Sequence, residues 1–169
     1  MKQKALLIAL IVSLLSVCSL QAQRTAGRRE FTGTLSLSAV AVDGGIGIFN
    51  ILVNPSMGWF VKDNLSVGAT IHYEGTGELG GLGLGPQVTY YFPSKSNVNF
   101  FLDAFGGLQM IHFSGYNFVG GAIGVGAGVS CTITPRVAWR SGIDYKMGIY
   151  SGPSLMHRLG LDMGFSINF

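Results

Sequence analysis

Apolar and polar residues alternate along most of this chain with a period of two. The alternation is clearest from 159 to 169, where every second residue is large and apolar: Leu159, Leu161, Met163, Phe165, Ile167 and Phe169. Successive side chains of a β-strand point to opposite faces, so this stretch predicts a strand with one apolar face and one small or polar face. About 9 to 11 such residues allow a tilted strand to cross a bilayer. The pattern therefore favours a membrane β-barrel.

The alternation predicts eight strands, which cover residues 31–40, 49–61, 65–73, 82–92, 98–110, 118–133, 137–147 and 158–169. Short polar turns are expected at 62–64, 93–97 and 134–136, and the other connections at 41–48, 74–81, 111–117 and 148–157. This order predicts an all-β fold, an eight-stranded antiparallel up-and-down transmembrane β-barrel. Pro55 and Pro86 interrupt two strands, and we expect a β-bulge or a water contact at each because proline has no N–H to pair.

A soluble barrel whose apolar face lines a ligand cup would show the same alternation. The other face distinguishes the two folds, because in a soluble barrel it would meet water and carry many Lys, Glu and Gln. Here it carries mainly Gly, Ser, Thr and Asn, which fit the narrow interior of an eight-stranded barrel. The glycines between 120 and 128 would leave room inside for Phe101 and Phe105. We therefore expect the polar face inside and the apolar face outside.

Most charged residues of the predicted strands fall on the polar face: Asp103, Arg140, Asp144, Lys146, Arg158 and Asp162. Charges removed from water need partners, so these residues predict an ion-pair network in the lumen. Arg140 is expected near Asp103, and the other two cations near the remaining two carboxylates. Such a network would close the lumen and exclude a large pore. A narrow channel lined by the same residues is the alternative.

Aromatic residues gather near the ends of the predicted strands, where amphipathic rings prefer the interface between lipid and water. Those expected at one interface are Trp59, Tyr90, Phe92, Phe100, Trp139 and Phe169. Those expected at the other are Tyr73, Tyr116, Phe118 and Tyr145. Two aromatic girdles around an apolar band are typical of a barrel in a membrane.

The first residues predict a secretory signal peptide. Lys2 and Lys4 precede an apolar run at 5–15, and Ala22 is the small residue at the expected cleavage site. The expected division is a signal peptide at 1–22, a flexible periplasmic leader at 23–30 and the transmembrane β-barrel domain at 31–169. A retained helical anchor, or a lipid on Cys18, is the alternative fate of this segment.

Composition narrows the function further. The chain has 169 residues, only 11% of them charged, and a mean hydropathy of +0.43. Without Lys2 and Lys4, nine Lys and Arg face eight Asp and Glu, so no basic stripe indicates a nucleic-acid partner. Cys131 would be the single cysteine left, and no spacing of possible ligands indicates a metal site. We expect no cofactor.

The segment 54–68, the run from Tyr90 to Pro93 and the last strand resemble the small outer-membrane β-barrel family described as porin-like, of the type common in Bacteroidetes. The polar-x-Gly-x-x-hydrophobic-x-aromatic pattern of the barrel-assembly signal is matched by Asp162, Gly164, Ile167 and Phe169. The resemblance implies the outer membrane of a Gram-negative cell. It also implies outer-membrane lipid, the barrel-assembly machinery and periplasmic chaperones as partners.

The resemblance implies a structural or surface-interaction role without catalysis, and it names no extracellular ligand. The alternative is a membrane enzyme that modifies lipid A, a deacylase or acyltransferase. His112-Phe113-Ser114 resembles the His-x-Ser arrangement of the deacylases, but no nearby acid would orient His112. His72 beside Glu74, and His157, are expected at the rim. We therefore predict no catalytic residue.

Overall fold

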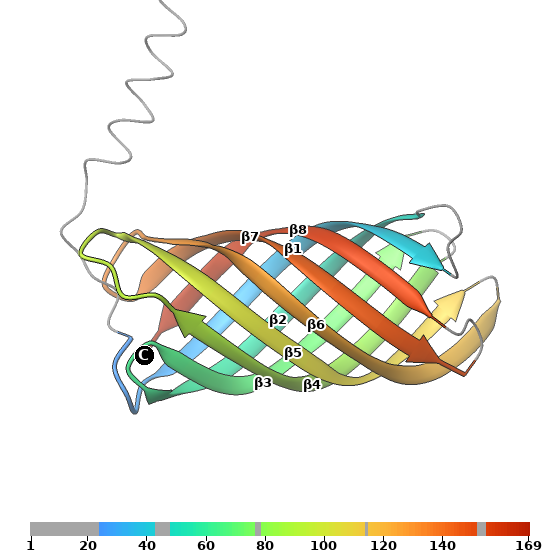
Figure 1. Ribbon diagram of the computed structural model, residues 1–169, viewed down its shortest axis with the longest axis horizontal. Helices are drawn as coiled ribbons and strands as arrows, with labels where there is room; N and C mark the ends of the chain where they lie inside the picture. Colours follow the sequence, from blue (N-terminus) through green and yellow to red (C-terminus); the bar gives the residue numbers. More distant parts are fainter. Residues whose placement is uncertain (1–23, 43–47, 77–78, 114, 152–154) are drawn as a thin grey trace, which may run out of the picture.

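The computed structural model describes residues 24–42, 48–76, 79–113, 115–151 and 155–169. Eight strands, each paired with its neighbours in sequence, form one closed antiparallel barrel (Figure 1). They are β1 (Arg29–Val42), β2 (Ile48–Lys62), β3 (Leu65–Thr76), β4 (Leu79–Tyr91), β5 (Val98–Phe113), β6 (Tyr116–Thr132), β7 (Val137–Tyr150) and β8 (Met156–Asn168). β8 closes the barrel on β1, for example at the pair Leu35 and Met163. The predicted fold is confirmed.

The barrel has two different ends (Figure 1). We call the end with the turns β2–β3, β4–β5 and β6–β7 the inner end, and the start of β1 and Phe169 also lie there. The opposite end is the outer end. Asn64 takes a positive φ of 64° in the β2–β3 turn, a conformation that asparagine tolerates better than most residues. The expected signal peptide at 1–22 lies outside the described residues.

Several strands are longer than the sequence predicted. β3 continues to Thr76 and brings Glu74 into the ladders with Leu52 and Gly81, although 74–81 was expected to be a loop. β1 begins at Arg29, inside the segment that was expected to be a flexible leader. Charged residues and glycines are typical of loops, so these positions were expected to lie outside the strands. They also fit a strand whose inward face is polar.

Neither proline forms the β-bulge that was one of the two expectations, and the other, a water contact, stays a prediction. At Pro55 the β2–β3 ladder has no paired residues, yet the register is the same on both sides of the gap. The β4–β5 ladder has the same kind of gap at Pro86. Proline removes one donor, and the strands open there without gaining a residue. The register shift lies instead between Phe60 and Lys62, next to the β2–β3 turn.

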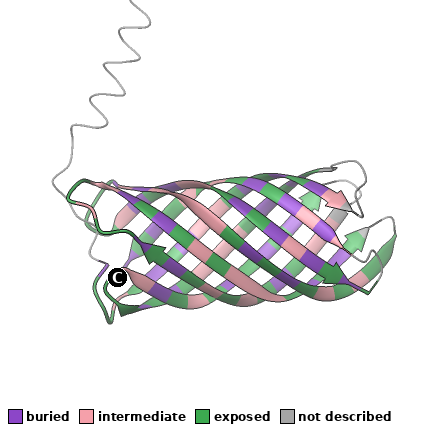
Figure 2. Ribbon diagram, in the orientation of Figure 1, coloured by how far each residue is buried: buried purple, intermediate pink, exposed green. Residues whose placement is uncertain are grey.

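Exposed and buried residues alternate along every strand (Figure 2). The outward residues are large and apolar, as with Leu161 and Phe165, which are 61% and 53% exposed. The inward residues are mostly Ser, Thr, Asn, Gln and charged residues, and most of them are buried. This distribution contradicts the soluble alternative, because a soluble barrel does not present a continuous apolar surface to water. No helix in the described ranges is long and apolar enough to cross a membrane.

The glycines of β6 make room for large side chains of β5, as the sequence predicted. A Cβ atom on Gly124 would lie 2.2 Å from Cζ of Phe105, and one on Gly128 would lie 2.7 Å from Cζ of Phe101. The β6 face of the lumen is therefore shaped to accept the β5 rings.

Candidate functional site

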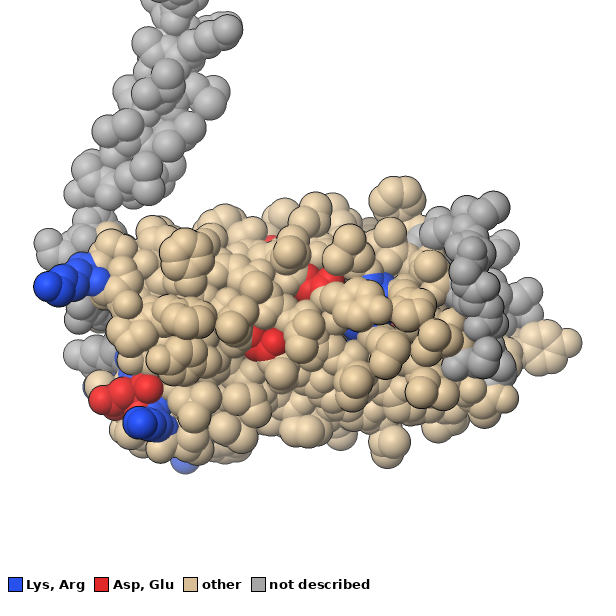
Figure 3. All heavy atoms as spheres, viewed as in Figure 1, with Lys and Arg blue, Asp and Glu red and all other residues tan. Residues whose placement is uncertain are grey.

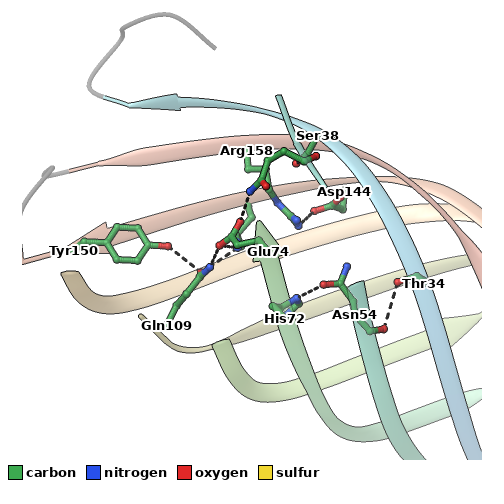
Figure 4. A network of polar contacts seen from close by, with 11 residues as sticks. Thr34, Ser38, Asn54, His72, Glu74, Gln109, Asp144, Tyr150 and Arg158 are labelled. Atoms are coloured by element: carbon green, nitrogen blue, oxygen red, sulfur yellow. Dashed lines mark hydrogen bonds and ion pairs between the residues drawn. The ribbon is translucent and has the colours of Figure 1, made fainter. Parts of the chain in front are cut away.

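The lumen holds nearly all the buried charge of the described residues, so it is the candidate site. Near the outer end Glu74 is the centre of a hydrogen-bonded network and is only 4% exposed (Figure 4). Its Oε2 accepts a hydrogen bond of 3.0 Å from Asn50 Nδ2, and its Oε1 accepts one from Gln109 Nε2. Lys146 Nζ lies 3.4 Å from Glu74 Oε1 and donates to Gln109 Oε1 at 3.0 Å. One carboxylate thus joins strands β2, β3, β5 and β7.

Two arginine–aspartate pairs lie deeper. Arg158 pairs with Asp144, and Arg140 Nη2 lies 3.3 Å from Asp103 Oδ2. Beside them is a cavity of about 40 Å³, which is large enough for a few water molecules. Its lining includes Asp162 and His72, and the His72 ring packs on Phe105 with the two ring centres 4.8 Å apart.

The inner end of the lumen contains an aromatic cluster of Phe60, Tyr91 and Phe101, and all three are buried. Arg24, which precedes β1, reaches into this cluster and lies with its guanidinium carbon 3.9 Å from the centre of the Tyr91 ring. Its two terminal nitrogens donate to Asn99 Oδ1 and Ser130 Oγ, at 2.9 and 2.7 Å. Burial lowers the pKa of the Arg24 guanidinium, although nearby Tyr91 opposes the shift.

A second apolar cluster lies at the outer end of the lumen. It consists of the buried side chains of Val40, Ile111, Tyr150 and Met156, with Phe118 packed against them. The Tyr150 hydroxyl donates to Gln109 Oε1 at 2.9 Å, so this outer cluster is tied to the Glu74 network below it. Polar and charged side chains thus occupy the middle of the lumen, between two apolar clusters.

The structure brings four of the six predicted network residues together as two pairs, Arg140 with Asp103 and Arg158 with Asp144. Asp162 lies on the same cavity and makes no ion pair among the described residues. The pairing of Lys146 differs from the expectation, because its partner is Glu74. The expected rim position of Glu74 and of His72 is wrong, since both side chains are buried in the lumen.

Sequence reasoning also missed Arg24 and Glu30. The Glu30 carboxylate accepts a 2.5 Å hydrogen bond from the Tyr91 hydroxyl. The available signal was parity, since Glu30 continues the inward positions of β1 through Thr32. No periodic signal marks Arg24, which lies before the strand.

Eight of the aromatic residues expected at the two interfaces have exposed side chains: Trp59, Tyr73, Tyr90, Phe92, Phe100, Trp139, Tyr145 and Phe169. Tyr116 is exposed as well, whereas Phe118 packs against the outer cluster. Tyr90 and Phe92 make an edge-to-face pair with ring centres 5.1 Å apart.

The residues that match the assembly pattern divide between the two faces of β8. Ile167 and Phe169 are exposed on the outside, and Asp162 faces the lumen. Gly164 faces the lumen too, and a Cβ atom there would lie 2.0 Å from the backbone oxygen of Gly33. The glycine of the pattern is thus required by close packing of β8 on β1.

Little in the described residues indicates catalysis. His112 is exposed, and its Nδ1 lies 2.9 Å from Oδ1 of Asn117, an amide and not a carboxylate. Ser114 lies outside the described residues. His157 is paired with Tyr145, whose hydroxyl is 2.6 Å from its Nδ1. In the described part of the chain no group of three or more His, Cys, Asp or Glu side chains could hold a metal ion.

No family model and no curated protein matches this sequence. Solved structures do match its fold. Neisserial surface protein A aligns with a TM-score of 0.72 and 18% identity over 85% of this chain and 99% of that chain. The N-terminal β-barrel domain of Pseudomonas aeruginosa OprF aligns with a TM-score of 0.60 and 14% identity over 85% and 98%. A designed transmembrane β-barrel aligns with a TM-score of 0.51 and 15% identity over 87% and 99%.

Sequence identities this low indicate a shared fold but not a shared activity. The designed barrel illustrates that the fold by itself specifies no role. The closed antiparallel sheet, the apolar exterior and these matches agree with one another. The chain has the fold of the small eight-stranded transmembrane β-barrels.

Proposed function

We propose that this protein is an integral outer-membrane β-barrel with a structural or surface-interaction role, that it has no enzymatic activity, and that its lumen does not conduct. The location rests on the apolar exterior, the fold and the predicted signal peptide at 1–22. The sequence resemblance to the porin-like Bacteroidetes family belongs to this proposal. Two proteins of similar fold are Neisserial surface protein A and Ail, the attachment invasion locus protein of Yersinia pestis. Both names fit a role at the cell surface.

The proposal that the lumen is closed rests on one observation, which is that side chains fill it. Two apolar clusters lie at its two ends, and paired charges occupy the space between them. An ion passing through would have to displace buried rings that make close contacts, for example Tyr91 and Phe101 with ring centres 6.0 Å apart. It would also have to compete with the three ion pairs that are already formed in the lumen.

The test is single-channel recording of the barrel in planar bilayers, with a general porin as positive control. We expect no stepwise conductance from the native protein. Arg24→Ala removes the guanidinium at the inner end, but it leaves both apolar clusters, so it too is expected not to conduct. Stable conductance steps from the native protein would disprove the closed lumen. Steps from Arg24→Ala alone would mean that Arg24 is a gate and that the clusters are no barrier.

The same preparation tests the enzyme alternative. Lipid A is incubated with the reconstituted barrel, and its mass is measured before and after. We expect no change, because the described partner of His112 is an amide. Loss or gain of an acyl chain that disappears in His112→Ala would overturn the non-enzymatic proposal.

We also propose that the pattern ending in Phe169 is recognised by the barrel-assembly machinery. Phe169→Ala should lower the amount of folded barrel in the outer membrane, because the aromatic group of the pattern is lost. Phe92→Ala is the matched control, since Phe92 is also an exposed inner-end ring but is not part of the pattern. The measurement is the heat-modifiable band in the outer-membrane fraction. Equal loss in both variants would contradict a specific role for Phe169.

A further inference from the structure

Cations outside the lumen are distributed very unevenly. Arg24, Arg140, Lys146 and Arg158 are buried inside the barrel. The other cations of the described residues all lie at the inner end, and we call them the basic rim: Arg28, Arg29, Lys62, Lys95 and Arg136. Figure 3 shows Lys and Arg atoms at this end of the molecule together with an acidic group, and smaller charged areas visible between the side chains of the barrel wall. The described residues of the outer end carry no Lys or Arg on the outside.

The basic rim surrounds the barrel. Arg28 and Arg29 lie at the start of β1, and each of the three inner turns contributes one cation: Lys62, Lys95 and Arg136. All of them except the half-buried Arg28 are exposed. None makes an ion pair among the described residues, and Asp63, the acid in the β2–β3 turn, accepts a hydrogen bond from the backbone N–H of Ala26. Positive charge around the whole mouth suits a partner that encircles the barrel.

Aromatic residues fix the depth of the basic rim. Trp59 is paired with Arg29, and Phe92, Phe100 and Trp139 are exposed near the same end. Such rings settle at the level of lipid headgroups, and long Lys and Arg side chains beside them reach the phosphates. The inner-end cations therefore lie where headgroup phosphates of the adjacent leaflet would be.

We propose that the basic rim binds the headgroups of anionic phospholipids in the leaflet next to the inner end. The proposal rests on the proposed membrane location. Its chemistry is the pairing of guanidinium and ammonium groups with phosphates that carry no compensating amine. Since the outer end has no matching cations among its described residues, the preference belongs to one leaflet and favours one orientation.

The two tryptophans of the sequence, Trp59 and Trp139, provide a local probe, because both have exposed side chains near the basic rim. The barrel is reconstituted in phosphatidylcholine vesicles that contain either brominated phosphatidylglycerol or the same amount of brominated phosphatidylcholine. Bromine quenches tryptophan fluorescence only at contact, so the ratio of quenching reports enrichment of the anionic lipid. We expect about fivefold enrichment, which corresponds to about 1 kcal/mol for a cation at an anionic surface. Enrichment should fall as salt is added.

The triple variant Lys62→Gln, Lys95→Gln, Arg136→Gln should remove most of the enrichment. These turn residues are exposed and make no ion pair in the described structure, so the barrel should still fold, as heat-modifiable migration will show. Asp63→Asn is the matched control in the same rim and should keep the enrichment or increase it. Equal quenching by the two lipids in the native protein, or unchanged enrichment in the folded triple variant, would overturn the proposal. Absence of quenching by either lipid would instead refute the membrane location itself.

Discussion

Replacing Glu74 by glutamine is expected to lower the free energy of unfolding by about 3 to 5 kcal/mol, the cost of leaving a buried charge without its partner. Glutamine has nearly the shape of glutamate, so packing changes little. The Lys146 ammonium, however, would lose the negative charge of the carboxylate that lies 3.4 Å away and would be left with neutral acceptors such as Gln109 Oε1. The measurement is urea-induced unfolding of the barrel in lipid vesicles.

A second substitution separates charge from packing. Glu74→Gln combined with Lys146→Met removes both charges and should restore most of the lost stability, since buried ion pairs are often replaced by apolar residues at little cost. Asp63→Asn is the control, because it removes an exposed carboxylate and should change stability by less than about 0.5 kcal/mol. If Glu74→Gln and Asp63→Asn have the same small effect, the Glu74 network contributes nothing to stability.

Gly124→Ala is expected to destabilise the barrel by about 1 to 3 kcal/mol, the usual cost of overpacking a filled interior. The added Cβ atom would lie 2.2 Å from Cζ of Phe105 and 2.7 Å from both its Cε atoms, so the ring would have to move. His72 packs on the same ring, which limits where it can go. Unfolding in urea and heat-modifiable migration both measure the effect.

Gly33→Ala is the matched control, because Gly33 is also a strand glycine but a Cβ atom there would have nothing within 4 Å. It should leave stability unchanged. Gly124→Ala combined with Phe105→Leu should recover part of the loss, since the smaller side chain vacates the space. A Gly124→Ala variant as stable as Gly33→Ala would show that the Phe105 ring is not confined by β6.

The sequence was sufficient for the strand number, the strand order and the two faces, because a period of two is a local pattern that survives in every strand. It was insufficient for the end of β3 and the start of β1, which include Glu74 and Glu30. Both are charged residues next to expected connections, and a charge there fits a loop as well as a polar lumen. At Pro55 and Pro86 the sequence could not choose between a bulge and a water contact, because a missing donor can be accommodated by a local opening and does not require an extra residue.

Within the lumen, the sequence could place charges at similar depths but could not choose among partners. Lys146 pairs with Glu74, which lies across the barrel on β3. The carboxylates expected to pair with it were Asp144 on β7 and Asp162 on β8. Such a choice depends on side-chain reach across the interior, which periodicity does not contain. Arg24 was beyond prediction because it enters the lumen from a segment with no strand pattern.

The pairing of β1 with β8 has a consequence for how the barrel forms. The first strand can complete its hydrogen bonds only after the last has been made, so every earlier stage of folding has two open strand edges. Contacts so distant in sequence form slowly, and open edges invite pairing with other chains. Backbone groups at such edges also cannot remain unpaired in lipid. Insertion and closure must therefore occur together, after synthesis of the whole chain and with the edges protected until then.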